Sequence, residues 1–196
     1  MCRDIAIQSE VRENWFKNHI AQVEVDLDDL KVINWGEPGT NLYRVRYVFD
    51  RNKVYISGDI GSAIFQVNNK IDINFFKDIN VWYFFDKLEA MSCDRYDWSS
   101  EECVSSLDEW FKAFDKDDYE EVSDEIEELM ERASYCPTKE EWIYQVVNDE
   151  YNDLIRNLDY CYDEWIYDIG QVIPRRVYGW LIGLEMIAEQ LGGGKN

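Results

Sequence analysis

Carboxylates are the most abundant chemically active side chains in this sequence, and they gather in one segment. The segment 117–131 holds nine acidic residues and no basic residue: Asp117, Asp118, Glu120, Glu121, Asp124, Glu125, Glu127, Glu128 and Glu131. Carboxylates at this density can ligate a metal ion, activate water or present negative charge to a basic partner. The spacing of the surrounding residues distinguishes between these chemistries.

The spacing gives little support to metal-dependent chemistry. Counted from Asp115, a calcium loop would have Tyr119 at its fifth position, Glu120 where glycine is required, and Ile126 in place of the bidentate glutamate. Because the chain has 41 acidic residues, many carboxylate pairs are possible, and no motif distinguishes one pair from another. We therefore expect no cofactor, and a metal-dependent hydrolase using clustered carboxylates remains the third hypothesis for function.

Nucleophilic catalysis and zinc binding would need imidazoles and thiols at short spacings. The chain has one histidine, His19, expected in a helix, and five cysteines that form no Cys-x-x-Cys pair. The segment 58–62 lacks the lysine of a phosphate-binding loop, so we interpret it as a turn in which glycine permits positive φ. Together these patterns predict that the protein is not an enzyme. Turn glycines are expected at Gly36, Gly39, Gly58 and Gly61.

A helix is expected to position the acidic run. The apolar residues of this segment recur at helical spacing and define an inward stripe of Val122, Ile126, Leu129 and Ala133, which leaves the acids on the remaining arc. At a rise of about 1.5 Å per residue the run is about 21 Å long, or about one charge per 2.3 Å. Duplex DNA carries about one charge per 1.7 Å of its axis. Like charges four residues apart destabilise a helix, so a basic partner would relieve this repulsion.

Residues 1–92 are expected to form an α+β module. Helices are predicted over 8–20 and 74–91, and β-rich runs occur at 23–27, 32–35, 42–49, 53–57 and 63–67. The residues Asp50-Arg51-Asn52 between two of these runs are typical of a hairpin turn. The module should therefore contain a small antiparallel β-sheet with flanking helices.

Residues 93–196 are expected to form an acidic, all-helical region. Helices are predicted over about 99–116, 117–134, 138–155 and 174–191, and the third of these is expected to resume after a break near 157–159 and to continue to 169. Ser99 or Ser100 can cap the first of these helices, and Thr138 with Glu141 matches a capping box for the third. An acid precedes tryptophan at 109–110, 141–142 and 164–165.

The last expected helix, 174–191, is apolar on several sides. Its apolar residues follow a heptad-like spacing, and Gly179 and Gly183 lie four residues apart. Two interpretations remain open. The helix can be buried in the core, where the glycines allow close packing, or it can form a homodimer.

The charge of the chain limits its partners. The net charge of the 196 residues is −21, of which residues 1–90 carry −3 and residues 91–196 carry −18. Phosphates would be repelled by most of this surface, so we expect no direct binding to nucleic acid or to a membrane. The sequence shows no signal-peptide pattern and no apolar run near the roughly 20 residues that span a bilayer, so we expect a location in the host cell cytoplasm.

Three segments resemble an N-terminal module of small proteins encoded by phages and mobile elements of low-GC Gram-positive bacteria. They are Trp35-Gly-Glu-Pro-Gly-Thr40, Tyr43-Arg-Val-Arg-Tyr-Val-Phe49 and Tyr55-Ile-Ser-Gly-Asp-Ile-Gly-Ser-Ala-Ile-Phe65. The resemblance covers about a third of the chain and carries over no catalytic residue. In composition, the acidic remainder resembles DNA-mimic inhibitors of restriction and CRISPR nucleases. The resemblance implies an anti-defence role such as that of an anti-CRISPR.

The leading hypothesis is a non-enzymatic inhibitor of a host defence nuclease, with Cas9-type effectors as the first candidates. Such nucleases hold guide and target backbones in a positively charged channel. The partner would be a basic nucleic-acid-binding protein, contacted through the nine acids of 117–131. The second hypothesis is a structural or adaptor protein whose acidic face serves only to solvate it.

Overall fold

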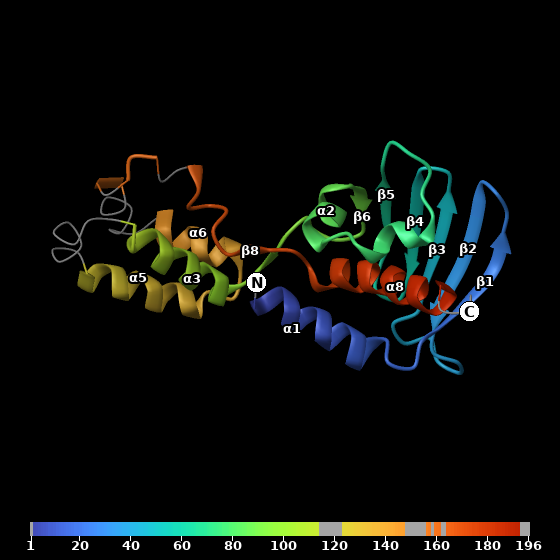
Figure 1. The fold of residues 1–196 in the computed structure, drawn as a ribbon. Coiled ribbons are helices and arrows are strands. Elements are labelled where there is room, and N and C mark those ends of the chain that lie inside the picture. Colours follow the sequence, from blue (N-terminus) through green and yellow to red (C-terminus); the bar gives the residue numbers. More distant parts are fainter. Residues whose placement is uncertain (1, 114–122, 148–155, 158, 162–163, 193–196) are drawn as a thin grey trace. The chain divides into compact units, whose positions relative to one another are not determined.

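The computed structural model describes residues 2–113, 123–147, 156–157, 159–161 and 164–192 (Figure 1). The chain divides into two compact units: unit 1 comprises residues 1–95 and 173–196, and unit 2 comprises residues 96–172. Each unit has its own hydrophobic core. Unit 1 carries an antiparallel sheet and unit 2 is mainly helical, so the expected α+β class is confirmed.

Unit 1 is built on a six-stranded antiparallel sheet whose strands are neighbours in chain order. The strands are β1 (Ile20–Asp26), β2 (Leu30–Gly36), β3 (Val45–Asp50), β4 (Lys53–Gly58), β5 (Ala63–Gln66) and β6 (Leu88–Met91). On β3, Val45, Tyr47 and Phe49 are buried while the residues between them are half-buried, as expected when successive side chains point to opposite faces. The expected hairpin is confirmed, because Arg51 has a φ of 54° between the paired strands β3 and β4.

Helix α8 (Arg175–Gly192) packs on the apolar face of this sheet (Figure 1). The Tyr47 hydroxyl on β3 donates a hydrogen bond of 2.9 Å to the carbonyl of Trp180. A Cβ atom at Gly183 would collide with that hydroxyl, so glycine is what lets the helix approach the sheet. The structure thus differs from the expected division at residues 92–93, since the last helix belongs to unit 1. Burial in the core of its own chain accounts for this helix without a homodimer.

The remaining helices of unit 1 correct two expectations. They are α1 (Cys2–Glu10), the π-helical turn η1 (Val11–Trp15), the 3-10 turn η2 (Ile73–Lys77) and α2 (Val81–Asp86). The helix expected over 8–20 instead begins at Cys2. Ile20, the last residue of the expected helix, is the first residue of strand β1. The single helix expected over 74–91 is wrong. It is interrupted because the Asn80 side chain caps a new helix by accepting from the Tyr83 amide, and residues 88–91 pair with β5 as a strand.

Unit 2 is formed by α3 (Ser100–Phe111), α5 (Ser123–Tyr135) and α6 (Lys139–Val147). Both expected caps are confirmed: the Ser99 hydroxyl accepts from the Glu102 amide at 3.2 Å, and the Thr138 hydroxyl accepts from the Glu141 amide at 3.2 Å. A two-residue ladder that the sequence did not predict joins β7 (Asp97–Trp98) to β8 (Gln171–Val172). The helical continuation expected to residue 169 is wrong for residues 164–169, which form a 3-10 residue and turns instead of an α-helix, and residues 148–155 lie outside the described residues.

Among the described helices of both units, not one combines the length and the apolar character that crossing a bilayer requires.

Candidate functional site

The described part of the predicted acidic segment lies on α5. Its first four acids (Asp117, Asp118, Glu120 and Glu121) lie outside the described residues. The other five are exposed: Asp124, Glu125, Glu127, Glu128 and Glu131. Ile126, Leu129 and Ala133 are buried, so the expected inward stripe is confirmed at these three positions, and Val122 lies outside the described residues. We refer to the five exposed acids as the α5 acidic face.

The helical geometry of α5 concentrates its charge opposite the core. At 3.6 residues per turn, Asp124 and Glu131 project directly opposite the buried stripe, and Glu127 and Glu128 flank them on either side. Arg132 is the one basic residue of α5, and its guanidinium pairs with Glu128 at 3.1 Å, one turn earlier. The helix therefore neutralises part of its charge at one edge and keeps the outward arc anionic.

The whole of unit 2 is strongly anionic. Residues 96–172 contain 24 acids and 5 bases, a net charge of −19, whereas the rest of the chain has a net charge of −2. Three described bases of this unit already pair with acids of the same unit, in Lys112–Asp108, Arg132–Glu128 and Lys139–Asp168. These three bases are thus already paired within unit 2, and a large surplus of carboxylates remains.

The tryptophans of the three acid–tryptophan segments belong to the core of unit 2. Trp142 is fully buried and donates its indole N–H to the carbonyl of Ile166 at 3.0 Å. Trp110 and Trp165, whose ring centres lie 4.7 Å apart, donate their indole N–H groups to the same carboxylate oxygen of Asp159, at 3.4 and 2.9 Å. The hydrogen bond from Trp165 is the main reason why the pKa of Asp159 is lowered. Sequence reasoning had not singled out Asp159.

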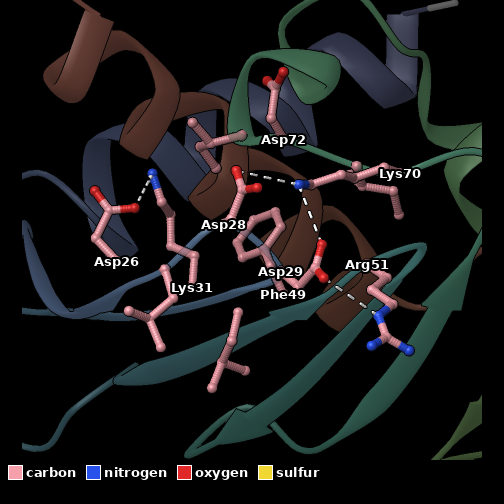
Figure 2. A pocket seen from close by; sticks show the side chains of 12 residues that line it. Asp26, Asp28, Asp29, Lys31, Phe49, Arg51, Lys70 and Asp72 are labelled. Carbon is pink, nitrogen blue, oxygen red and sulfur yellow. Dashed lines mark ion pairs between the residues drawn. The ribbon is translucent and has the colours of Figure 1, made fainter.

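Unit 1 contains a pocket of about 380 Å³ between the β1–β2 turn and the segment that precedes η2 (Figure 2). Its bases and acids form the ion pairs Lys31–Asp26 (3.0 Å), Lys70–Asp28 (3.6 Å), Lys70–Asp29 (3.3 Å) and Arg51–Asp29 (3.7 Å). Asp72, which also lines the pocket, accepts from the Asn74 amide at 2.7 Å. Because the charged groups in the pocket satisfy one another, we assign no ligand to it.

The imidazole and two of the thiols are held in apolar surroundings. His19 lies between η1 and β1 rather than in a helix, is buried beside Phe16 and Trp35, and has a pKa lowered by that burial. Burial raises the pKa of the Cys103 thiol to about 12 and also raises that of Cys136. Such thiols stay protonated and unreactive at neutral pH. In the described part of the chain, no three His, Cys, Asp or Glu side chains come together as a metal site.

The segment 58–62 is a turn next to β3. Gly58 and Gly61 have positive φ, and a Cβ atom at Gly58 would overlap the carbonyl of Arg44. Asp59 holds this turn by accepting from the Tyr43 amide at 2.8 Å and by donating its own amide to the Arg44 carbonyl at 2.8 Å. The turn interpretation is confirmed for Gly39, Gly58 and Gly61. Gly58 is also the last residue of β4, but its carbonyl accepts from the Gly61 amide at 3.1 Å and so closes the turn. The turn interpretation is wrong for Gly36, which ends β2, pairs with Ile20 and precedes the turn that the Thr40 amide closes on the Glu37 carbonyl.

No protein-family model matches the chain, no curated protein matches it, and no solved structure matches it. Among the features of the chain itself, the α5 acidic face and the charge of unit 2 have the clearest chemical consequence.

Proposed function

We propose that the protein is a phage-type inhibitor that occupies the basic nucleic-acid-binding surface of a host defence nuclease, with Cas9-type effectors as the first candidates. The observation that carries the proposal is the exposed α5 acidic face within a unit of net charge −19. Effectors of this kind hold nucleic-acid backbones with Lys and Arg side chains. A dense set of carboxylates can pair with the same side chains and exclude DNA by competition.

The charge density of α5 supports a DNA-mimic mode of binding. The five described acids span seven residue steps, which is about 10 Å of helix axis, or about one charge per 2 Å. The corresponding value for duplex DNA is about 1.7 Å. A protein groove whose positive charge is complementary to a DNA backbone would thus meet a similar density of negative charge on this helix.

The amount of charge exceeds what solubility requires. A net charge of roughly 2 to 8 in magnitude is sufficient to keep a small domain in solution, and unit 2 carries −19. On α5, Asp124 and Glu128, and likewise Glu127 and Glu131, are four residues apart, and such like-charge pairs each destabilise a helix by about 0.2–0.5 kcal/mol. The fold tolerates this repulsion, and a cationic partner would remove it.

The test is a competition assay with a guide-loaded Cas9-type effector and a labelled target duplex. Increasing amounts of the protein should displace the duplex, and the inhibition should weaken steeply as salt rises, since each charge contact is screened. Changing Asp124→Asn, Glu127→Gln and Glu131→Gln together should weaken inhibition by about tenfold or more, because three screened charge contacts of roughly 0.5 kcal/mol each are lost. The melting temperature should stay equal or rise.

A matched control removes the same number of charges from unit 1, by Asp50→Asn, Asp78→Asn and Asp94→Asn, all at exposed positions. This variant should inhibit as well as the wild type. Equal losses in the two variants would mean that only net charge matters. Full inhibition by the α5 variant would contradict a role for this face, and failure of the wild-type protein to displace DNA from any effector tested would contradict the partner class.

A further inference from the structure

Two tyrosines of unit 2 lie on its anionic helices with their rings in solvent. Tyr135, at the end of α5, is 76% exposed, and Tyr144, on α6, is 68% exposed. By contrast, Trp142 on α6 is completely buried. Neither tyrosine has a ring contact or a side-chain hydrogen bond with the described residues. Both rings are thus available to a partner.

Each of these rings follows an exposed glutamate by one helical turn. Glu131 precedes Tyr135 by four residues on α5, and Glu140 precedes Tyr144 by four residues on α6. Both glutamates are exposed, and Glu141, three residues before Tyr144, is exposed as well. Side chains three or four residues apart on a helix are neighbours, with Cβ atoms about 5–6 Å apart. The same combination of ring and carboxylate therefore occurs on two separate helices.

A carboxylate beside an aromatic ring matches the chemistry of arginine. The guanidinium is planar, so its edge can donate hydrogen bonds to a carboxylate while its face stacks on a ring, whereas the lysine ammonium is a compact and strongly hydrated charge. The chain itself contains an arginine–aromatic contact, because the guanidinium of Arg95 lies over the ring of Phe85, 4.5 Å from its centre. Carboxylates alone would not provide the stacking surface.

We propose that Tyr135 with Glu131, and Tyr144 with Glu140 and Glu141, each bind an arginine side chain of the basic partner, so that this surface prefers arginine over lysine. The inference rests on the proposed function, because it specifies the chemistry of the partner for the same anionic unit. Charge complementarity selects a cationic partner, and the exposed rings select among cations.

The experiment compares two fluorescein-labelled peptides of equal charge, nona-arginine and nona-lysine, binding to the full-length protein by fluorescence anisotropy at 150 mM salt. The arginine peptide should bind more tightly, by about two- to fivefold for each ring engaged. The variant with Tyr135→Leu and Tyr144→Leu should lose this preference and keep the wild-type affinity for the lysine peptide. The variant with Tyr135→Phe and Tyr144→Phe should keep the preference, since the phenyl ring still stacks.

The outcomes separate this inference from the function on which it rests. Equal affinity for the two peptides, or an arginine preference that survives the leucine variant, would overturn the arginine sites and leave an anionic binding surface intact. Binding of neither peptide would contradict the proposed anionic surface as well. Thermal unfolding of both variants, followed by circular dichroism, checks that they are folded, and the lysine peptide reports on the charge of the surface independently of the rings.

Discussion

At the scale of single residues, Asp159 shows that an acid of the anionic unit can have a structural role. It accepts hydrogen bonds from Trp110, 49 residues earlier, and from Trp165, six residues later. Its carboxylate thereby connects α3 to the turns that follow residue 159. A position with this role should be sensitive to substitution, unlike the exposed acids of α5.

We expect Asp159→Ala to lower the free energy of unfolding by about 1 kcal/mol at neutral pH, because two indole N–H groups and the Cys161 amide lose a partially solvent-screened acceptor. The Trp165 hydrogen bond lowers the pKa of Asp159 from its ordinary 3.8. A group with a depressed pKa in the folded state stabilises the fold above the unfolded-state pKa, and this contribution is lost as pH falls through the folded-state pKa. The difference between wild type and variant should therefore shrink below pH 3.8, as measured by urea unfolding at several pH values.

The matched control is Asp159→Asn, which keeps a neutral acceptor and should fall between wild type and Asp159→Ala at pH 7. A difference between wild type and Asp159→Ala that stays constant from pH 7 down to pH 2.5 would contradict the role of the ionised carboxylate.

Single residues also show which parts of the candidate site could be predicted from the sequence. The α5 acidic face was predictable, because both the acids and the buried stripe follow helical spacing within one segment. The pairs of Tyr135 with Glu131 and Tyr144 with Glu140 carry the same local signal, four residues apart, but sequence reasoning missed them. The role of Asp159 was not predictable, because one of its indole partners lies 49 residues away and is brought near only by the fold.

At the scale of elements, local signals predicted the caps and turns and failed where packing decides. The hairpin at 50–52, the Ser99 cap and the Thr138 cap involve residues within a few positions of one another, and all are present. The aromatic segment 74–91 has helical character in its residue types, yet it divides into η2, α2 and β6. Its final residues complete the sheet by pairing with β5, and that long-range pairing overrides the local preference.

The contact between α8 and β3 gives a test at this scale. Changing Gly183→Ala should destabilise unit 1 by about 1–3 kcal/mol, because the added methyl group would overlap the buried hydroxyl of Tyr47, which is fixed by its bond to the Trp180 carbonyl. Chemical denaturation followed by tryptophan fluorescence measures the loss.

The control for this substitution is Gly192→Ala at the end of the same helix, where the nearest atom to an added Cβ is the terminal amine of Lys77, at the end of a flexible side chain. This variant should change stability by less than about 0.5 kcal/mol, as is usual for substitutions outside the core. Equal stability of the Gly183→Ala protein and the wild type would mean that α8 does not depend on close approach to the sheet.

At the scale of the whole molecule, unit 2 is an insertion within unit 1. The chain enters unit 2 near Asp97 and leaves it at Val172, and these two residues are partners in the β7–β8 ladder. Partners in an antiparallel ladder have Cα atoms about 4.5–5.5 Å apart, so the two ends of the insertion are adjacent. The change of charge near residue 90 revealed where the acidic unit begins. The packing of α8 on the sheet of unit 1 was not predictable, because the sequence does not show which surface covers an apolar helix.

This arrangement predicts that unit 1 folds without unit 2. Replacing residues 97–172 with a short Gly-Ser linker should leave a chain that unfolds cooperatively, because the core of the sheet and α8 comes entirely from residues outside the insertion. The deletion removes almost all of the net charge, so the shortened protein should no longer displace DNA from a Cas9-type effector, even at low salt. Circular dichroism and thermal unfolding test the fold, and the competition assay tests the activity on the same preparation. A shortened chain that is folded and still inhibits would place the activity in unit 1, whereas one that fails to fold would show that the sheet and α8 depend on the insertion.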